Sequence, residues 1–100
     1  MAKIAETLQS NGYAVQIEGH SDGVPIHTAQ FPSNWELSTA RATELTRLLI
    51  EKYGIPPARL SAAGYAEYHP IADNATEEGR TLNRRVDIIL RAPVQAKDAH

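Results

Sequence analysis

The chain has 100 residues, of which 12 are Asp or Glu, 10 are Lys or Arg and none is Cys, so its formal net charge is −2. This length predicts one domain, and 42% apolar with 22% charged residues is typical of a globular protein. The small negative charge argues against a nucleic-acid-binding protein, which needs a basic surface. The lack of Cys excludes thiol catalysis and Cys-based zinc sites, and the sequence contains no apolar run long enough for a membrane span.

The first third of the chain alternates between two periodic patterns. Apolar residues at helical spacing predict a short helix over residues 2–10. Residues 13–18 alternate apolar and polar side chains and predict a half-buried strand that ends at Gly19. Residues 20–32 carry Gly, Pro and small polar residues, which predicts a long loop. Loops of that length in small domains are usually functional or mobile.

A longer helix follows the loop. Ser33 and Glu36 have the spacing of a capping box, which predicts that the helix begins here, and Gly54 and the two following prolines predict its end. One stripe of this helix is expected to face the core. Its members are Leu37, Arg41, Leu45, Leu48 and Leu49, with Ala40 and Lys52 beside them. Arg41 is the odd member of an otherwise apolar stripe.

The second half repeats the alternation. Residues 60–65 predict a strand, Asn74 is expected to cap a short helix that reaches residue 83, and residues 85–91 predict a strand buried on one face and partly on the other. Helices and strands therefore alternate. This order predicts an α/β fold, an α+β sandwich in which helices pack on a small mixed sheet and the long helix joins two parallel strands by a right-handed crossover. Residues 1–92 form the single expected domain, and residues 93–100 a flexible tail.

Opposite charges follow the first strand and begin the long helix. In α/β folds, ligands usually bind beyond the carboxyl ends of strands, where a helix N-terminus offers unpaired N–H groups. Ser21 and Asp22 are expected there, near Asn34 and Arg41. A carboxylate and a guanidinium together could bind a zwitterion, the carboxylate taking an ammonium and the guanidinium a carboxylate. The alternative is that Arg41 reaches out to solvent, or pairs with Asp22 for stability alone.

Two other groups of residues admit functional interpretations. His20, His27 and His69 could join Asp22 in a metal site, although no local pair of ligands has the spacing of a known metal motif. Arg84 and Arg85 belong to a basic stretch before the last strand. Cations at a helix C-terminus that offset the helix dipole are the simpler interpretation of that stretch, and an anion site is the alternative.

Four ordered motifs between residues 13 and 90 resemble the OmpA-like peptidoglycan-binding domain family. They are Gly-His-Ser-Asp at 19–22, Asn-Trp-Glu-Leu-Ser-Thr-Ala-Arg-Ala at 34–42, Leu-Ser-Ala-Ala-Gly-Tyr-Ala-Glu at 60–67, and Asn-Arg-Arg-Val-Asp-Ile at 83–88. Within that family, residues 31–38 and 72–76 are most similar to the flagellar motor stator proteins. The resemblance implies a β-α-β-α-β sheet and binding to the diaminopimelate residue of the peptidoglycan stem.

The resemblance also implies roles for individual residues. Asp22 and Arg41 would clasp diaminopimelate, with Asn34 and the backbone around Leu37 as supporting contacts. Ser21 stands where the family usually has Thr, which keeps the hydroxyl group. The family's Arg near the last strand corresponds to Arg84 or Arg85. The implied function is non-enzymatic and uses no metal or other cofactor.

The resemblance further implies a cellular context. We expect a periplasmic domain of a protein anchored in the bacterial inner membrane, which forms a homodimer and pairs with a MotA-type stator membrane subunit. Family domains usually begin with a strand before the first helix, so a neighbouring strand is expected to be absent or supplied elsewhere. A stator protein also has an N-terminal membrane helix with a proton-carrying Asp, which this sequence lacks, so the chain is expected to be an excised periplasmic portion. Two alternatives remain. The same module could belong to an outer-membrane lipoprotein or a secretion-system protein, or His20, Asp22 and His69 could serve a metal-dependent cell-wall hydrolase.

Overall fold

The computed structural model describes residues 2–10 and 12–91, so the expected tail at 93–100 lies outside the described residues. Three helices and three strands alternate along the chain in the predicted order, and a short 3-10 turn at Pro57–Arg59 precedes the second strand. The elements are α1 (Ala2–Ser10), β1 (Ala14–Gly19), α2 (Asn34–Glu51), β2 (Leu60–Gly64), α3 (Glu77–Asn83) and β3 (Val86–Arg91).

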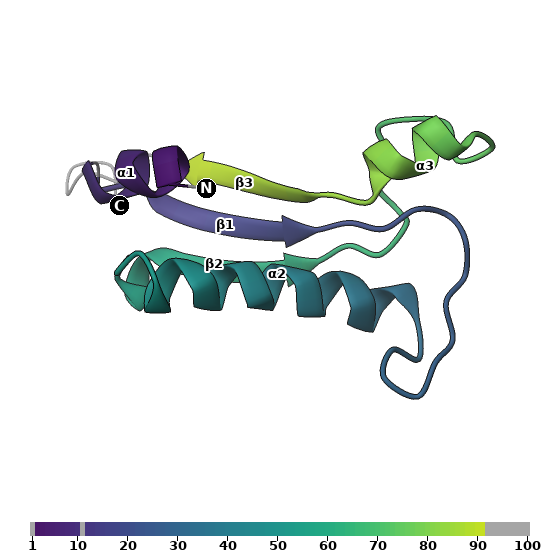
Figure 1. The fold of residues 1–100 in the computed structure, drawn as a ribbon, viewed down its shortest axis with the longest axis horizontal. Coiled ribbons are helices and arrows are strands. Elements are labelled where there is room, and N and C mark those ends of the chain that lie inside the picture. Colours follow the sequence, from purple (N-terminus) through teal and green to yellow (C-terminus); the bar gives the residue numbers. More distant parts are fainter. Residues whose placement is uncertain (1, 11, 92–100) are drawn as a thin grey trace, which may run out of the picture.

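The three strands form one mixed sheet with β1 in the centre, which confirms the predicted fold class. β1 pairs in parallel with β2 and antiparallel with β3, so Ile17 lies opposite Ala62 on one side and Ile88 on the other. The parallel pair is connected through α2, as expected. Figure 1 shows α2 running alongside β1 and β2, while α3 and the loop after β1 lie at the same end of the molecule.

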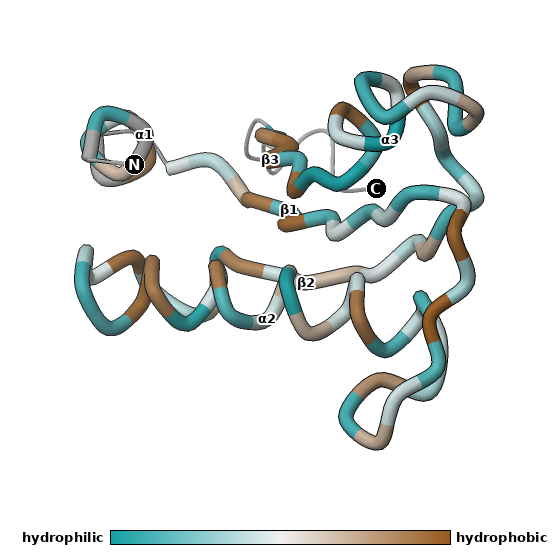
Figure 2. Tube along the Cα trace, turned by 45° about the vertical axis from the view of Figure 1, so that its right-hand side comes forward, coloured by the Kyte–Doolittle hydropathy of each residue, from teal (hydrophilic) through white to brown (hydrophobic). Residues whose placement is uncertain are grey.

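The core lies between the sheet and α2. β1 alternates buried and half-buried residues, because a strand sends successive side chains to opposite faces. Figure 2 shows short hydrophobic patches that recur along α2 between hydrophilic ones, as expected for a helix with one buried face. The core cluster consists of Leu8, Val15, Ile17, Ala42, Leu49 and Ile55.

The buried face of α2 differs from the predicted stripe. Its buried residues are Asn34, Ser38, Ala42 and Leu49, whereas Arg41 and Leu48 are exposed. The cause is the close approach of α2 to β1. A Cβ atom added at Gly19 would lie 1.9 Å from the Ser38 carbonyl oxygen, so only small side chains fit between helix and strand. The sequence pattern predicted that large apolar residues of α2 would be buried, but the narrow space between α2 and β1 favours small ones.

The last helix and strand also depart from prediction. α3 begins after Thr76, whose hydroxyl accepts a hydrogen bond from the Gly79 N–H at 2.9 Å, and Asn74 is not the cap. The Asn74 side chain instead connects the loop after β1 to the end of α3. Its Oδ1 accepts hydrogen bonds from the N–H of Gly23 and from the side chain of Asn83. The last three residues of β3 are exposed and its first three are half-buried, so the expected burial of this strand extends over its first half only.

Among the described residues, α2 has the length of a membrane-spanning helix, but neither it nor the two shorter helices is apolar enough to cross a bilayer.

The contact between α2 and β1 predicts a large effect of one methyl group. Gly19→Ala should lower the free energy of unfolding by about 3 kcal/mol, because the new Cβ meets backbone atoms that cannot rotate away. Gly54→Ala is the matched control: Gly54 has φ +68° and open space around its Cα, so only the left-handed conformation costs energy, about 1 kcal/mol. Urea unfolding followed by circular dichroism measures both. Equal losses in the two variants would contradict the account.

Candidate functional site

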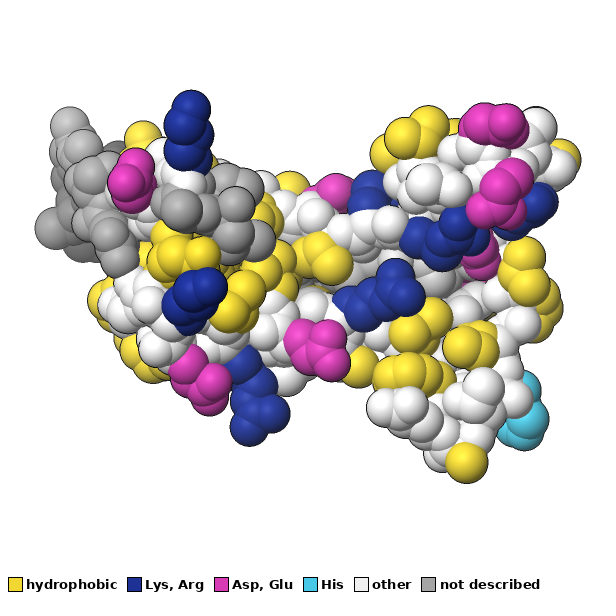
Figure 3. All heavy atoms as spheres, in the orientation of Figure 1, with side chains coloured by type: hydrophobic (Ala, Val, Ile, Leu, Met, Phe, Trp, Pro, Cys, Tyr) yellow, Lys and Arg dark blue, Asp and Glu magenta, His cyan; other side chains and the backbone are white. Residues whose placement is uncertain are grey.

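A groove of about 260 Å³ lies at the end of the molecule where β1 leads into the long loop. Loop residues 24–26 form one wall, and the first turns of α2 and the end of α3 contribute the others. Figure 3 shows basic side chains gathered in the hollow between the α3 end and the loop, beside acidic ones. The groove brings together six of the seven predicted site residues: Ser21, Asp22, Asn34, Leu37, Arg41 and Arg84.

Backbone hydrogen bonds fix the position of Ser21 and Asp22. The Ser21 N–H donates to the Ala66 carbonyl oxygen at 2.9 Å, and the Gly23 N–H donates to Asn74 Oδ1 at 3.0 Å. Ala66 has φ +54°, an uncommon conformation for a residue with a side chain. The Ser38 hydroxyl holds it there by accepting from the Ala66 N–H at 3.0 Å. The segment that carries Asp22 is therefore tied to α2 as well as to the turn before α3.

The start of α2 is closed by its own cap. Ser33 Oγ accepts from the Trp35 N–H at 3.2 Å, and the Ser33 hydroxyl donates to the Glu36 carboxylate, which lowers the pKa of Glu36. The Leu37 N–H is also used, since it donates to the Ser33 carbonyl oxygen. The expected role of the backbone around Leu37 as a supporting contact stays a prediction, although the Leu37 N–H is already used within the helix. The half-buried residue Leu37 contributes to the groove lining.

Asn34 acts as a brace for the loop. It is 4% exposed, and its side-chain amide donates to the Val24 carbonyl oxygen at 3.1 Å. This contact ties the loop wall to the first turn of α2. Asn34 therefore shapes the groove by holding Val24 in place.

Asp22 is paired with Arg84, not with Arg41. Arg84 Nη1 donates to Asp22 Oδ2 at 2.7 Å, and the Val24 N–H donates to Asp22 Oδ1 at 3.0 Å. Arg84 also donates to Glu77 Oε1 at 2.8 Å. The hydrogen bonds of Arg84 to Glu77 and Asp22 raise the pKa of Arg84, and those that Glu77 accepts from Arg84 and Arg80 lower the pKa of Glu77. One guanidinium therefore links two carboxylates from different parts of the chain.

Arg41 is the unpaired charge of the groove. Its residue is exposed, and within residues 2–10 and 12–91 it makes no hydrogen bond or ion pair. The alternative in which Arg41 and Asp22 form a stabilising pair is therefore wrong. The planar guanidinium of Arg41 keeps its donors available for a carboxylate, a group that it matches in geometry.

Arg85 points away from the groove. Its Nε lies 3.1 Å from both carboxylate oxygens of Asp87, and its Nη2 donates to the His69 carbonyl oxygen at 3.0 Å. The side chains of Arg84 and Arg85, which are neighbours directly after α3, thus lie at different places: Arg84 in the groove and Arg85 beside Asp87. The sequence left Arg84 and Arg85 as equivalent candidates, and the structure places Arg84 in the groove.

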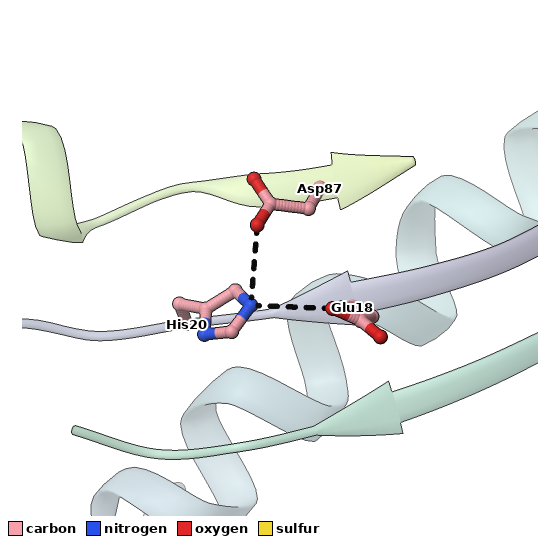
Figure 4. A group of neighbouring side chains, drawn as sticks. All are labelled: Glu18, His20 and Asp87. Atoms are coloured by element: carbon pink, nitrogen blue, oxygen red, sulfur yellow. Dashed lines mark ion pairs between the residues drawn. The ribbon is translucent and has the colours of Figure 1, made fainter. Parts of the chain in front are cut away.

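The predicted metal-ligand set of His20, Asp22 and His69 is not assembled. His20 instead faces Glu18 and Asp87, while Asp22 is held by Arg84. Burial, and then the positive charge of Arg85, lower the pKa of His20. Figure 4 shows the imidazole between the two carboxylates. The hydrolase alternative, which needed the predicted set, therefore lacks its ligands.

Sequence reasoning missed two supports of the groove. Glu77 at the start of α3 holds Arg84, which lies directly after the helix, two turns further along. Asn83 is fully buried and accepts from the N–H groups of Ile71 and Ala72, which fixes the turn that leads to Asn74. No local sequence pattern predicts this role of Asn83.

A larger hollow of about 550 Å³ lies along another face of α2, between Trp35 and Arg47. None of the predicted site residues lines it. Trp35 stacks on Tyr68 beside it, with ring centroids 5.4 Å apart. The groove, which holds the predicted site residues, is therefore the candidate site rather than the larger hollow.

Known proteins share this sequence and fold. The OmpA family matches residues 1–84. The chain is 47% identical over 74 residues to Motility protein B of Bacillus subtilis (74% of this chain, 28% of the relative), and 42% identical over 76 residues to Outer membrane porin F of Pseudomonas aeruginosa (76% and 21%). The chain spans less than two fifths of the curated relatives that it matches.

Two solved structures share the fold over nearly the whole chain. The cell wall anchor of the T6SS from Pseudomonas aeruginosa superposes with a TM-score of 0.83 at 43% identity, covering 92% of this chain and 64% of that one. The periplasmic domain of Helicobacter pylori MotB gives a TM-score of 0.82 at 33% identity, covering 90% and 58%.

The chain belongs to the OmpA family. It is an OmpA-like peptidoglycan-binding domain of periplasmic type, a binding module rather than an enzyme.

The Glu77–Arg84 pair predicts a specific dependence of stability on pH. Because the folded state lowers the pKa of Glu77 below its ordinary value of 4.5, the pair stabilises the fold above that value and loses this effect as the pH falls through the lowered pKa. Glu77→Gln should therefore lower the melting temperature at pH 7, and the difference from the parent should vanish well below pH 4.5.

Glu78→Gln is the control for Glu77→Gln, because Glu78 lies in the same helical turn and makes no ion pair with any described residue. Thermal denaturation of the three proteins at both pH values provides the measurement. A deficit of Glu77→Gln that persists unchanged in acid would exclude the pair as its cause.

Proposed function

We propose that the groove binds the diaminopimelate residue of a peptidoglycan stem peptide. The observation that carries this proposal is that Asp22 and Arg41 line one groove with opposite charges, while Arg41 makes no hydrogen bond or ion pair with the described residues. The end of the diaminopimelate side chain bears an ammonium and a carboxylate on the same carbon. A ligand of that kind needs one acceptor and one donor a short distance apart.

Asp22 is suited to receive the ammonium. Each of its carboxylate oxygens accepts one hydrogen bond in the groove, from Val24 and from Arg84. A carboxylate has about four acceptor positions, so an ammonium can bind without displacing either partner. The Arg84 pair holds the carboxylate in one orientation before the ligand arrives, which reduces the entropy lost on binding.

Arg41 is suited to receive the ligand carboxylate. A planar guanidinium binds a carboxylate through two parallel hydrogen bonds, which fixes its orientation. Charge-assisted hydrogen bonds contribute about 1.5–3 kcal/mol when partly dehydrated and less when exposed. Because Arg41 is exposed, a single stem should bind weakly.

Weak single sites suit attachment to a polymer. The resemblance to the family implies a homodimer. A dimer would hold two stems of the same wall, so the second binding event would be intramolecular. We infer that residues 1–92 act as one wall-binding domain within such an assembly. Attachment by several weak contacts also allows the anchor to be exchanged.

The similarity to Motility protein B supports a flagellar motor stator as the parent protein. In this proposal the domain anchors to the wall a MotB-like protein of the inner membrane, which pairs with a MotA-type subunit. The second candidate is a secretion-system wall anchor, which the match to the T6SS anchor favours. An outer-membrane protein is the third, through the match to porin F.

Co-sedimentation with purified peptidoglycan sacculi tests the site. Asp22→Asn and Arg41→Ala should each weaken binding by about tenfold or more, since each removes a charge-assisted contact. Arg47→Ala is the matched control, because Arg47 lies exposed on the same helix outside the groove. Folded Asp22→Asn and Arg41→Ala proteins that sediment like the parent would refute the assignment.

Domain exchange tests the stator proposal. The chain should restore swimming when it replaces the corresponding region of Bacillus subtilis Motility protein B, and Asp22→Asn in the chimera should abolish the rescue. The corresponding region of Helicobacter pylori MotB provides the positive control. A chimera that reaches the membrane and binds sacculi but does not support swimming would favour the secretion-system candidate.

A further inference from the structure

The face of the sheet opposite α2 carries a polar cluster that the groove does not use. Strand alternation places Glu18 on this face, and His20 follows it at the end of β1. On the neighbouring strand, Asp87 lies directly opposite Glu18 in the antiparallel register. Two carboxylates in directly opposed positions repel each other and destabilise the strand pair unless a cation lies between them.

His20 lies where that cation would be. Its Nε2 is 3.7 Å from Glu18 Oε1 and 3.5 Å from Asp87 Oδ2, distances too long for good hydrogen bonds. Figure 4 shows this nitrogen directed at both carboxylates. The remaining partners of the carboxylates are peripheral: Gln16 donates to the other oxygen of Glu18, and Arg85 contacts Asp87.

The imidazole of His20 is buried without hydrogen bonds. The residue is 4% exposed, and neither ring nitrogen has a hydrogen-bond partner among the described residues. Buried polar side-chain atoms are almost always hydrogen bonded, so such a group indicates a missing partner. Stacking on Tyr65, with ring centroids 5.4 Å apart, supports the ring in its orientation.

We propose that Glu18, His20 and Asp87 form a binding site for a divalent transition-metal ion of the zinc type. Ligand atoms about 2.0–2.2 Å from a tetrahedral zinc ion lie about 3.3–3.6 Å from one another, close to the 3.5 and 3.7 Å measured at His20. The three candidate ligand atoms all lie within 4.8 Å of one another. Only a small inward movement of the carboxylates is needed to complete the site.

The ligand types select the ion. One imidazole with two carboxylates suits zinc, cobalt or nickel, whereas calcium and magnesium prefer oxygen ligands alone. Both carboxylates are partly exposed, which leaves a coordination position for water. The positive charge of Arg85 beside Asp87 opposes a divalent ion, so the affinity should be moderate.

A bound ion would join the ends of β1 and β3 immediately before Ser21 and Asp22. The site lies on the other face of the sheet from the core, so an ion there would stabilise the strand ends without entering the groove. This inference concerns a structural ion and is independent of the ligand of the groove.

Titration of the chelator-treated protein with zinc chloride and with cobalt chloride tests the site. Calorimetry should give one zinc ion per chain, cobalt should develop the visible absorption of a tetrahedral complex, and zinc should raise the melting temperature. Glu18→Gln and Asp87→Asn should each weaken zinc binding by more than about tenfold, since loss of even an outer partner of a metal ligand costs about 10–100-fold. His20→Gln should abolish binding.

His27→Gln is the matched control. His27 lies exposed in the loop, so this substitution makes the same chemical change outside the cluster. It should bind zinc like the parent. If His20→Gln does not fold, Glu18→Gln and Asp87→Asn at the two partly exposed positions decide the question. A parent protein that binds no zinc, cobalt spectra without tetrahedral bands, or equal losses in His27→Gln and the cluster variants would overturn the proposal.

Discussion

The close contact between α2 and the ends of β1 and β2 determines the geometry of the candidate site. Gly19 lies against the Ser38 backbone, and Gly64 lies against Thr39, so the helix rests directly on the strands. The Ser38 hydroxyl holds Ala66 in its left-handed conformation, and the Ala66 carbonyl in turn receives the N–H of Ser21. A continuous series of contacts thus connects the helix that carries Arg41 to the segment that carries Asp22, and larger side chains at the glycine positions would separate the two.

The two charged side chains of the groove, Asp22 and Arg41, differ in whether other residues hold them in one orientation. Asp22 is oriented by Val24 and Arg84, whereas Arg41 makes no hydrogen bond or ion pair with the described residues. An oriented acceptor and an available donor together favour a ligand that carries both charges. Because Arg84 also binds Glu77, the acidic side of the groove depends on α3, and the basic side depends on α2. The site therefore requires α2, α3 and the segment after β1 that carries Asp22 to pack correctly.

The sequence predicted the element order, the mixed sheet and the cap at Ser33, because these follow from local periodicity and local hydrogen bonding. It mispredicted the buried face of α2, since the deciding contact is with Gly19 on another strand. The partner of Asp22 was also missed: Arg84 lies 62 residues away, and only the assembled fold shows which of two neighbouring arginines turns toward the groove. The pairing of Glu18 with Asp87 likewise required the strand register.

The central claim is that Asp22 and Arg41 together recognise a zwitterion. Calorimetric titration with two soluble stem peptides, identical except that one contains meso-diaminopimelate and the other lysine, tests it most directly. Both offer an ammonium to Asp22, but only diaminopimelate offers a carboxylate to Arg41. The account predicts that the parent protein binds the diaminopimelate peptide at least about tenfold more tightly, and that Arg41→Ala loses this preference. Equal affinities of the parent for the two peptides would contradict it.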